Sequence, residues 1–394
     1  MKFAVCNETF KDWPFEKAFA FAHDLGYTGI EFAPFTINPN AYDITPAKRE
    51  ELRRQAEDAK LEVVGLHWLL AFTEGYYLTS PDEEVRQRTT DYLCELARLC
   101  RDLGGKFLVL GSPHQRNLLP GVAEDQAMEF AADVIRGAVD VMHDCGVTLA
   151  VEPLGPEEGD FLLTAEKGIR LIEMVDSPSC RLHLDVKAMS SEDKPITDII
   201  RDSAEYMVHF HANDANRRGP GMGEIDFGPI FQTLQEIHYQ GWVSVEVFDY
   251  EPGVETLATE SIRYMQRCLG QLAVSDQGNA DHYSEDKFWM KVKGVTQFAG
   301  RKVIENALRL YYACQSPKTP AWAKAIIIST LGYFIFPMDA IPDFIPVAGF
   351  TDDLGAMLAA LGTVSLYITD EVKALARKKT DEWFGSSDKL SEND

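Results

Sequence analysis

The stretch RLHLDV at residues 181–186 decides the fold, because its pattern is that of a strand with one apolar and one polar face. Neighbouring side chains of a strand point to opposite faces, so Leu182 and Leu184 lie on one face and His183 and Asp185 lie on the other. The leucines predict an outer face that packs in a core. The polar face then points into an interior, where an unpaired charge costs several kcal/mol and must be compensated.

Three other segments alternate with the same phase: residues 147–154, 207–213 and 241–248. In each, apolar side chains occupy one face, and the opposite face ends in an acidic or imidazole side chain. The four inward residues at these strand ends are Glu152, Asp185, His211 and Glu246. Three carboxylates and one neutral imidazole are good ligands for a hard divalent cation. The sequence therefore predicts a single divalent-metal site.

Strand-like and helix-like segments alternate along residues 1–270. Strands are expected to begin near residues 2, 28, 61, 106, 147, 181, 206 and 241, and helical patterns cover residues 15–25, 81–103 and 123–145. Glycines at 26, 104, 146 and 241 fit helix exits. These repeated units predict an α/β protein with a (β/α)8 TIM barrel, whose active site lies at the carboxyl ends of the strands. A doubly wound open sheet is the alternative, but it explains less well why polar residues recur at nearly every strand's end.

More polar side chains fall at the same rim. Glu31 ends the second predicted strand, His67 and Trp68 end the third, His114 follows the fourth, and Glu158 lies in the loop after the fifth. Taken alone, Glu31 or His114 could equally cap a helix or pair with an arginine. The site prediction therefore depends on the set of four inward residues and not on any one rim residue.

The seventh loop, residues 209–227, is rich in glycine, which suits a loop that covers a substrate. Its Arg217 offers a forked donor for hydroxyl or phosphate oxygens. His183 and His209 each lie two residues deeper than a proposed ligand, so we expect them to support the ligands from behind. Glu157 is expected to be solvated.

Composition sets the class of protein. The formal net charge of −24 should repel nucleic acid, so no nucleic-acid partner is expected. The seven cysteines are scattered and form no CxxC pair, which predicts reduced packing residues. Lys2 is followed by a short strand-like segment and not by a long apolar run, so no secretory signal is expected. These features favour a cytoplasmic protein.

Four short motifs carry a resemblance to a known family: VEPL at 151–154, HLDVK at 183–187, HFHAND at 209–214 and VEVF at 245–248. They resemble the xylose-isomerase-like TIM barrels, which include sugar phosphate isomerases and ketose 3-epimerases. The similarity covers about residues 1–270. It implies a metal-dependent isomerase or epimerase acting on a small-molecule sugar or sugar phosphate, in a chain that could form a homo-oligomer.

The resemblance also implies roles for individual residues. In the ketose epimerases a Glu, Asp, His, Glu quartet binds Mn, Mg or Co, and the matching quartet here is Glu152, Asp185, His211 and Glu246. Manganese is the expected cation. Glu152 and Glu246 would exchange a proton on opposite faces of the sugar through an enediolate. By resemblance, Glu158 and Arg217 would contact the substrate. His67, from its place at the rim, and Lys187, from its place beside Ala188, are two further expected substrate contacts.

One position departs from the epimerase pattern. Epimerases of this kind carry a substrate-binding histidine three residues after the aspartate, where this chain has Ala188 preceded by Lys187. Lys187 could supply a charged contact to a carboxylate or phosphate, or it could point into solvent. A zinc endonuclease of the same scaffold would need histidines where Ala188 and Gly228 stand, so nuclease activity is not expected. A dehydratase of a keto-polyol and a non-catalytic sugar-binding protein stay open as alternatives.

Beyond residue 270 the composition changes. Residues 271–287 are predicted to be a linker, 288–385 a smaller all-α domain, and 386–394 an acidic tail. Helices are expected at 300–313, 320–336, 351–368 and 370–384. The turn PMDAIPDFIP at 337–346, followed by Asp352 and Asp353, resembles the YkvA-type domain of unknown function over about residues 295–385.

The four acidic residues of this motif are Asp339, Asp343, Asp352 and Asp353. We expect them to cap helices, with a cation or a basic partner as the alternative. The uncharged run 325–336 is shorter than the roughly 20 residues of a bilayer span, so a buried core helix is expected. The alternative is a hairpin that dips into a membrane, with Trp322, Tyr333 and Phe336 at the interface and the basic stretch 373–379 nearby. Residues 288–385 could in that way contact a membrane or a partner protein.

Overall fold

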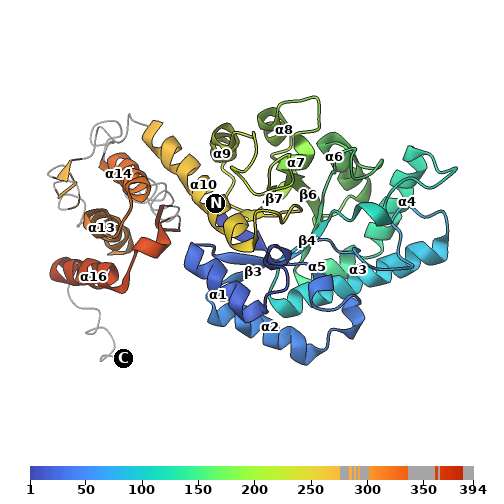
Figure 1. Ribbon diagram of the computed structural model, residues 1–394, viewed down its shortest axis with the longest axis horizontal. Coiled ribbons are helices and arrows are strands. Elements are labelled where there is room, and N and C mark those ends of the chain that lie inside the picture. Colours follow the sequence, from blue (N-terminus) through green and yellow to red (C-terminus); the bar gives the residue numbers. More distant parts are fainter. Residues whose placement is uncertain are drawn as a thin grey trace. The chain divides into compact units, whose positions relative to one another are not determined.

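The computed structural model describes residues 1–275, 284–285, 288–289, 292, 301–335, 360–362 and 364–384. The chain forms two compact units, Met1–Met265 and Gln266–Asp394. In the first unit, parallel strands follow one another in chain order and close on themselves, because β8 pairs with β1 (Figure 1). The strands are β1 (Lys2–Cys6), β2 (Gly29–Phe32), β3 (Glu62–Leu66), β4 (Phe107–Leu110), β5 (Thr148–Val151), β6 (Cys180–Asp185), β7 (Met207–Ala212) and β8 (Trp242–Val245). The predicted (β/α)8 barrel is confirmed.

Helices surround this barrel (Figure 1). They are α1 (Phe15–Leu25), α2 (Pro46–Asp58), α3 (Glu83–Leu103), α4 (Glu124–Arg136), α5 (Val139–Cys145), α6 (Ala165–Val175), α7 (Val186–Met189), α8 (Ile196–Asp202), α9 (Phe227–Glu236) and α10 (Val254–Ser275). Short 3-10 turns, η1 (Asn7–Phe10), η2 (Pro34–Thr36), η3 (Ala41–Asp43) and η4 (Pro113–Gln115), lie in the loops after strands. Side chains of Thr45, Asp82 and Thr164 cap helix starts, as their residue types favour.

Two helix predictions need correction. The pattern at 123–145 is two helices, α4 and α5, because the chain breaks at Gly137, where a Cβ would press against Thr90. Gly241 does not end a helix. The helix before it, α9, ends at Glu236, and His238 takes the left-handed conformation with a φ of 56°. Gly26, Gly104 and Gly146 do end their helices in that conformation.

The barrel interior is layered along the strand direction. Ala4, Val64 and Trp242 form a buried apolar cluster near the strand starts, and Phe107 packs against it. The Phe107 ring stacks on His209 with centroids 5.3 Å apart, so a histidine layer follows. Glu246 lies four residues beyond Trp242 in the chain. The acidic side chains at the strand ends therefore lie closer to the carboxyl ends of the strands than the apolar cluster does. The core is therefore apolar at one end and ionisable at the other.

The second unit is helical in its described residues. Helix α13 (Arg301–Gln315) packs against both α14 (Ala321–Ile335) and α16 (Asp370–Phe384). The helix predicted over 351–368 does not reach residue 368, because η5 (Ser365–Tyr367) is a 3-10 turn. None of the described helices is long and apolar enough to cross a membrane. The motif at 337–346, Asp352 and Asp353 lie outside the described residues, as does the tail 386–394.

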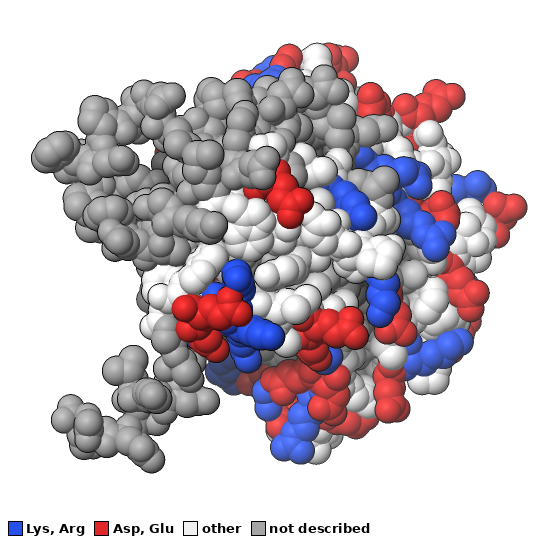
Figure 2. Space-filling view, turned by 90° about the vertical axis from the view of Figure 1, so that its left-hand side faces the viewer, with Lys and Arg blue, Asp and Glu red and all other residues white. Residues whose placement is uncertain are grey.

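The predicted linker is partly helical, because α10 continues to Ser275. All seven cysteines carry free thiols; six are buried and Cys314 is half-buried. On the face drawn in Figure 2, basic and acidic side chains are interspersed across the described surface. That face offers no continuous basic area among the residues described.

Candidate metal centre and substrate cavity

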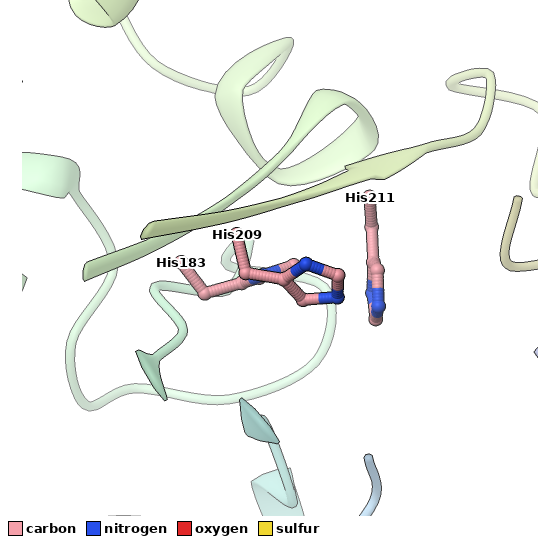
Figure 3. Close-up of side chains that lie close together, drawn as sticks. All are labelled: His183, His209 and His211. Atoms are coloured by element: carbon pink, nitrogen blue, oxygen red, sulfur yellow. The ribbon is translucent and has the colours of Figure 1, made fainter. Parts of the chain in front are cut away.

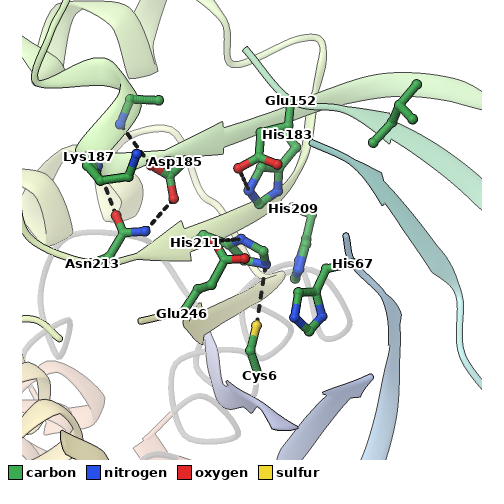
Figure 4. A network of polar contacts seen from close by, with 12 residues as sticks. Cys6, His67, Glu152, His183, Asp185, Lys187, His209, His211, Asn213 and Glu246 are labelled. Carbon is green, nitrogen blue, oxygen red and sulfur yellow. Dashed lines mark hydrogen bonds and ion pairs between the residues drawn. The ribbon is translucent and has the colours of Figure 1, made fainter. Parts of the chain in front are cut away.

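The four inward residues come together at the carboxyl ends of neighbouring strands (Figure 4). Glu152 follows β5, Asp185 ends β6, His211 lies in β7 and Glu246 follows β8. One ligand atom from each lies within 4.8 Å of the others. Each residue is at most 3% exposed. The structure thus brings together the set that strand periodicity selected.

The charges of this quartet are only partly offset by nearby cationic side chains, which are Lys187 for Asp185 and Arg116 for Glu152. Burial, with Glu246 and Asp185 close by, raises the pKa of Glu152 well above its usual range. Burial likewise raises the pKa of Asp185 to about 6. The Oε1 atom of Glu246 has no hydrogen-bond partner among the described residues. Three buried carboxylates facing one imidazole fit a divalent cation, which supplies the missing positive charge.

His211 joins the quartet to the protein behind it. Its Nδ1 lies 3.0 Å from Oε2 of Glu246. Burial alone would lower the pKa of His211, but Glu246, Cys6 and Glu31 raise it well above the usual range. When no metal is bound, the protonated imidazole of His211 therefore supplies positive charge next to the three carboxylates.

Asp185 is held by two hydrogen bonds. The backbone N–H of Ala188 donates to Oδ1 at 2.8 Å, and the side-chain amide of Asn213 donates to Oδ2 at 2.6 Å. The side-chain oxygen Oδ1 of Asn213 in turn accepts from the backbone N–H of Lys187 at 2.9 Å. Asn213 was missed as a site residue, although it lies two residues beyond His211 and so continues the inward set of that segment.

A second layer of ionisable residues lies behind the quartet. The rings of His183, His209 and His211 lie side by side, with ring nitrogens within 4.8 Å of one another (Figure 3). Glu31 accepts from Nε2 of His209 at 2.8 Å and from Nε2 of His211 at 3.2 Å. Glu31 thus neither caps a helix nor pairs with an arginine. Both nitrogens of His183 lack a hydrogen-bond partner among the described residues.

His67 lies in this inner layer and not at the cavity surface. It is completely buried, and its Nε2 lies 2.7 Å from Oε2 of Glu8. Burial acts against ionisation of His67, but Cys6 and Glu8 hold its pKa well above the usual range. Glu8 comes from the turn η1, where the strand period no longer applies, so the sequence pattern did not single it out.

Arg116 and Gly111 position Glu152. Arg116 is almost completely buried, and its Nη1 donates to the backbone oxygens of Glu152 at 2.7 Å and Leu110 at 3.0 Å. Burial lowers the pKa of Arg116 to about 10. At Gly111 an added Cβ would overlap the Oε2 atom of Glu152. The carboxylate of Glu152 therefore occupies space that only a glycine leaves open.

A cavity of about 610 Å³ opens beside Glu152, which is the quartet member on its surface. Lys187 and Glu158 line it, and their side chains form an ion pair at 2.7 Å. Lys187 therefore faces the cavity, and its side chain is only 12% exposed. His114 lines the same cavity, consistent with its place at the rim.

Aromatic rings and Arg217 form another part of this wall. The Trp68 and Phe248 rings stack with centroids 5.7 Å apart, and Phe72 is 71% exposed at the cavity. Arg217 has a φ of 69°, a strained value for an arginine, and its guanidinium lies 6.0 Å from the Phe248 ring. Such a wall suits a ring-shaped polyhydroxy ligand, with an apolar face to stack on and a forked donor at the edge.

Comparison with known proteins places this geometry in context. A family model described as "Xylose isomerase-like TIM barrel" matches residues 19–268, and one described as "Protein of unknown function (DUF1232)" matches residues 323–359. A probable ketose 3-epimerase of Synechocystis sp. is 27% identical over 64% of this chain and 90% of that protein. A D-psicose 3-epimerase of Ruminiclostridium cellulolyticum is 30% identical over 43% of this chain and 59% of that protein.

Solved structures share the fold. The structure of D-psicose 3-epimerase with D-tagatose from Clostridium cellulolyticum H10 aligns with a TM-score of 0.61 at 20% identity, covering 68% of this chain and 99% of that one. A structure of L-ribulose 3-epimerase aligns with a TM-score of 0.60 at 23% identity, covering 68% and 95%. At these identities the likeness speaks for the barrel alone.

Proposed function

Because the chain belongs to the xylose isomerase-like TIM barrel family, we propose that it is a divalent-metal-dependent isomerase or epimerase of a sugar or sugar phosphate. The observation that carries the proposal is the buried quartet of three carboxylates and one imidazole beside an open cavity. Relatives named as ketose 3-epimerases support the same reaction class. Manganese is the expected cation, with magnesium or cobalt as substitutes, and Glu152, Asp185, His211 and Glu246 would hold it.

When bound, the cation polarises the substrate carbonyl and acidifies the neighbouring C–H. Glu152 and Glu246 then divide the proton transfer. They come from β5 and β8, so their carboxylates reach the site from different sides. One would remove the proton from carbon, and the other would return a proton to the opposite face of the resulting enediolate.

The cavity wall would hold and orient the sugar. Arg217 has no ion pair among the described residues, so its donors are free for hydroxyl or phosphate oxygens. Glu158 would accept from a sugar hydroxyl while Lys187 fixes its carboxylate. The stacked rings of Trp68 and Phe248 would cover an apolar face of the ring and displace water from it.

Metal content tests the first half of the proposal. Purified full-length protein is stripped with a chelator, reconstituted with Mn²⁺, Co²⁺ or Mg²⁺ and measured by elemental analysis. We expect about one equivalent of metal per chain, since one quartet supplies one set of ligands. Retention of none of the three cations would end the proposal.

Proton exchange tests the second half. The protein is incubated with a panel of ketoses, ketose phosphates, keto-sugars and inositol ketones in deuterated buffer with Mn²⁺, and deuterium at carbon is read by NMR. We expect exchange with at least one compound, and Glu152→Gln should lower the rate by roughly 10²- to 10⁴-fold. Glu129→Gln is the matched control, because Glu129 is exposed on α4 and lies neither in the quartet nor in the cavity wall. No exchange with any compound would favour a sugar-binding protein without catalysis.

A further inference from the structure

We propose that Glu31 is a positioning residue that fixes the ring and the ring proton of His211, so that Nδ1 is the nitrogen left for a cation. This inference rests on the metal site proposed above. Glu31 lies in β2, across the barrel from β7, which carries His211. It is completely buried, as is His211, so no solvent molecule competes for their contact.

The two oxygens of Glu31 are used by two different imidazoles. Oε2 lies 2.8 Å from Nε2 of His209, and Oε1 lies 3.2 Å from Nε2 of His211. An ionised carboxylate accepts hydrogen bonds and donates none, so both rings must carry their proton on Nε2. One buried side chain thereby sets the proton position of two neighbouring histidines.

For His211, this proton position decides which ring nitrogen can bind a cation. With the proton on Nε2, a neutral ring offers its lone pair at Nδ1. Nδ1 is also the nitrogen that lies 3.0 Å from the Glu246 carboxylate, on the side of the quartet (Figure 4). Two acceptors facing each other at that distance require a proton or a cation between them. Glu31 thus turns His211 into a ligand aimed at the quartet, as carboxylates commonly do behind metal-bound histidines.

Besides Glu31, the side chain in hydrogen-bond contact with Nε2 of His211, among the described residues, is the thiol of Cys6. Its Sγ lies 3.8 Å from that nitrogen. A thiol is a weak acceptor and serves one ring at a time, so it does not replace a carboxylate that binds two. The Cys6 contact therefore does not fix the proton when Glu31 is changed.

Glu31→Gln is the sharp test, because an amide keeps the volume but offers one acceptor and one donor. Either His209 or His211 must then present a bare Nε2 to the amide N–H, and in His211 the proton moves to Nδ1, where it blocks the cation. We expect Mn²⁺ to bind the full-length protein 10- to 100-fold more weakly, measured by titration calorimetry on metal-free protein. In the Co²⁺-loaded protein the visible absorption bands should shift, which a merely structural role would not produce.

Glu8→Gln is the matched control. Glu8 holds His67 in the same way, with Oε2 2.7 Å from Nε2. Ligand atoms of Glu8 and His67 lie within 4.8 Å of one of Glu246, but His67 is not a quartet member, so no quartet ligand takes its ring proton position from Glu8. We expect its Mn²⁺ affinity to stay within about threefold of wild type. Equal affinities of Glu31→Gln and wild type, or equal losses in both variants, would overturn the proposal.

A measurement on the wild-type chain keeps the proposal testable if Glu31→Gln fails to fold. In protein with ¹⁵N-labelled histidines and Mg²⁺, the His211 signals, assigned by their loss in His211→Gln, should show a protonated Nε2. A bare Nε2 would overturn the role of Glu31. If the wild-type protein binds no cation, the proposed metal site fails, and a bare Nε2 in the metal-free protein would separately overturn the role of Glu31.

Discussion

The barrel and the C-terminal helical unit differ in where their charged side chains lie. In the barrel, Glu152, Asp185 and Glu246 are buried and face one another, and Glu31 is buried in the layer behind them. In the described part of 266–394, no charged side chain is buried, and the buried positions of α13 are mostly apolar, as at Leu308. There charges form pairs at the surface of helices, such as Lys379 with Glu382 at 2.7 Å.

This difference indicates that the barrel, and not the helical unit, contains groups that serve the reaction and lower the free energy of unfolding. Each uncompensated buried carboxylate lowers the free energy of unfolding. We therefore expect such a cluster where a bound ligand stabilises the folded protein in return. The described residues of the helical unit contain no cluster of buried carboxylates, and their buried positions serve mainly for packing. Substitutions that cost function at little cost in stability should therefore be found in the barrel, and those with the reverse effect in the helices.

Gly111→Ala should have the largest effect and should act on function. The new Cβ would overlap the carboxylate of Glu152, which can swing away more easily than the strand can move. We expect proton exchange to fall by roughly 10²- to 10⁴-fold, as for loss of a catalytic base, while the melting temperature changes little. Deuterium exchange and calorimetry give the two quantities.

A double variant separates this cause from general damage to the barrel. If Gly111→Ala acts by displacing Glu152, adding Glu152→Gln should cause little further loss, because neighbouring residues that act as a unit are not additive. Full additivity of the two losses would contradict the geometric explanation.

Leu308→Ala should show the opposite behaviour. Leu308 is completely buried in α13, so its truncation should destabilise the helical unit by about 2–5 kcal/mol. Every residue that lines the cavity belongs to Met1–Met265, so exchange should stay at the wild-type rate. Calorimetry should show one transition shifted. Leu149→Ala, at an equally buried position of β5, is the matched change and should shift the barrel's transition and lower exchange.

The barrel half of this comparison was largely readable from sequence. All eight strands begin within one residue of the predicted positions, because buried strands between glycine-ended helices leave a strong local pattern. The quartet was predicted from the same pattern, because side chains along a strand point alternately to its two faces. Local periodicity therefore predicts which side chains point inward.

Periodicity does not predict which inward residues meet. Glu31 contacts His209 and His211 across the barrel, and this pairing depends on strand tilt and closure, which no local pattern encodes. Arg116 follows the short turn η4 and reaches back to Glu152 by its length alone. In the helical unit the most distinctive motif, 337–346, lies outside the described residues, so its acidic residues stay a prediction.

Lys187→Met should have an intermediate effect. It removes the partner of Glu158 at the cavity wall but leaves the backbone N–H that binds Asn213. We expect kcat/KM to fall about tenfold, equivalent to about 1.4 kcal/mol, with Mn²⁺ affinity nearly unchanged. Lys194→Met is the control, because Lys194 is 61% exposed in a surface pair. An unchanged kcat/KM for Lys187→Met would remove this ion pair from the account of the cavity.

Gly362→Ala should have the smallest effect and the opposite sign. Gly362 is helical, and an added Cβ would meet nothing within 4 Å, so alanine should stabilise the helical unit by up to about 1 kcal/mol. Gly104→Ala also has open space, but its φ of 93° is left-handed, so the barrel should lose about 1 kcal/mol. Both should leave exchange unchanged. Since space alone would make the two glycines alike, equal stability changes would show that backbone conformation does not separate them.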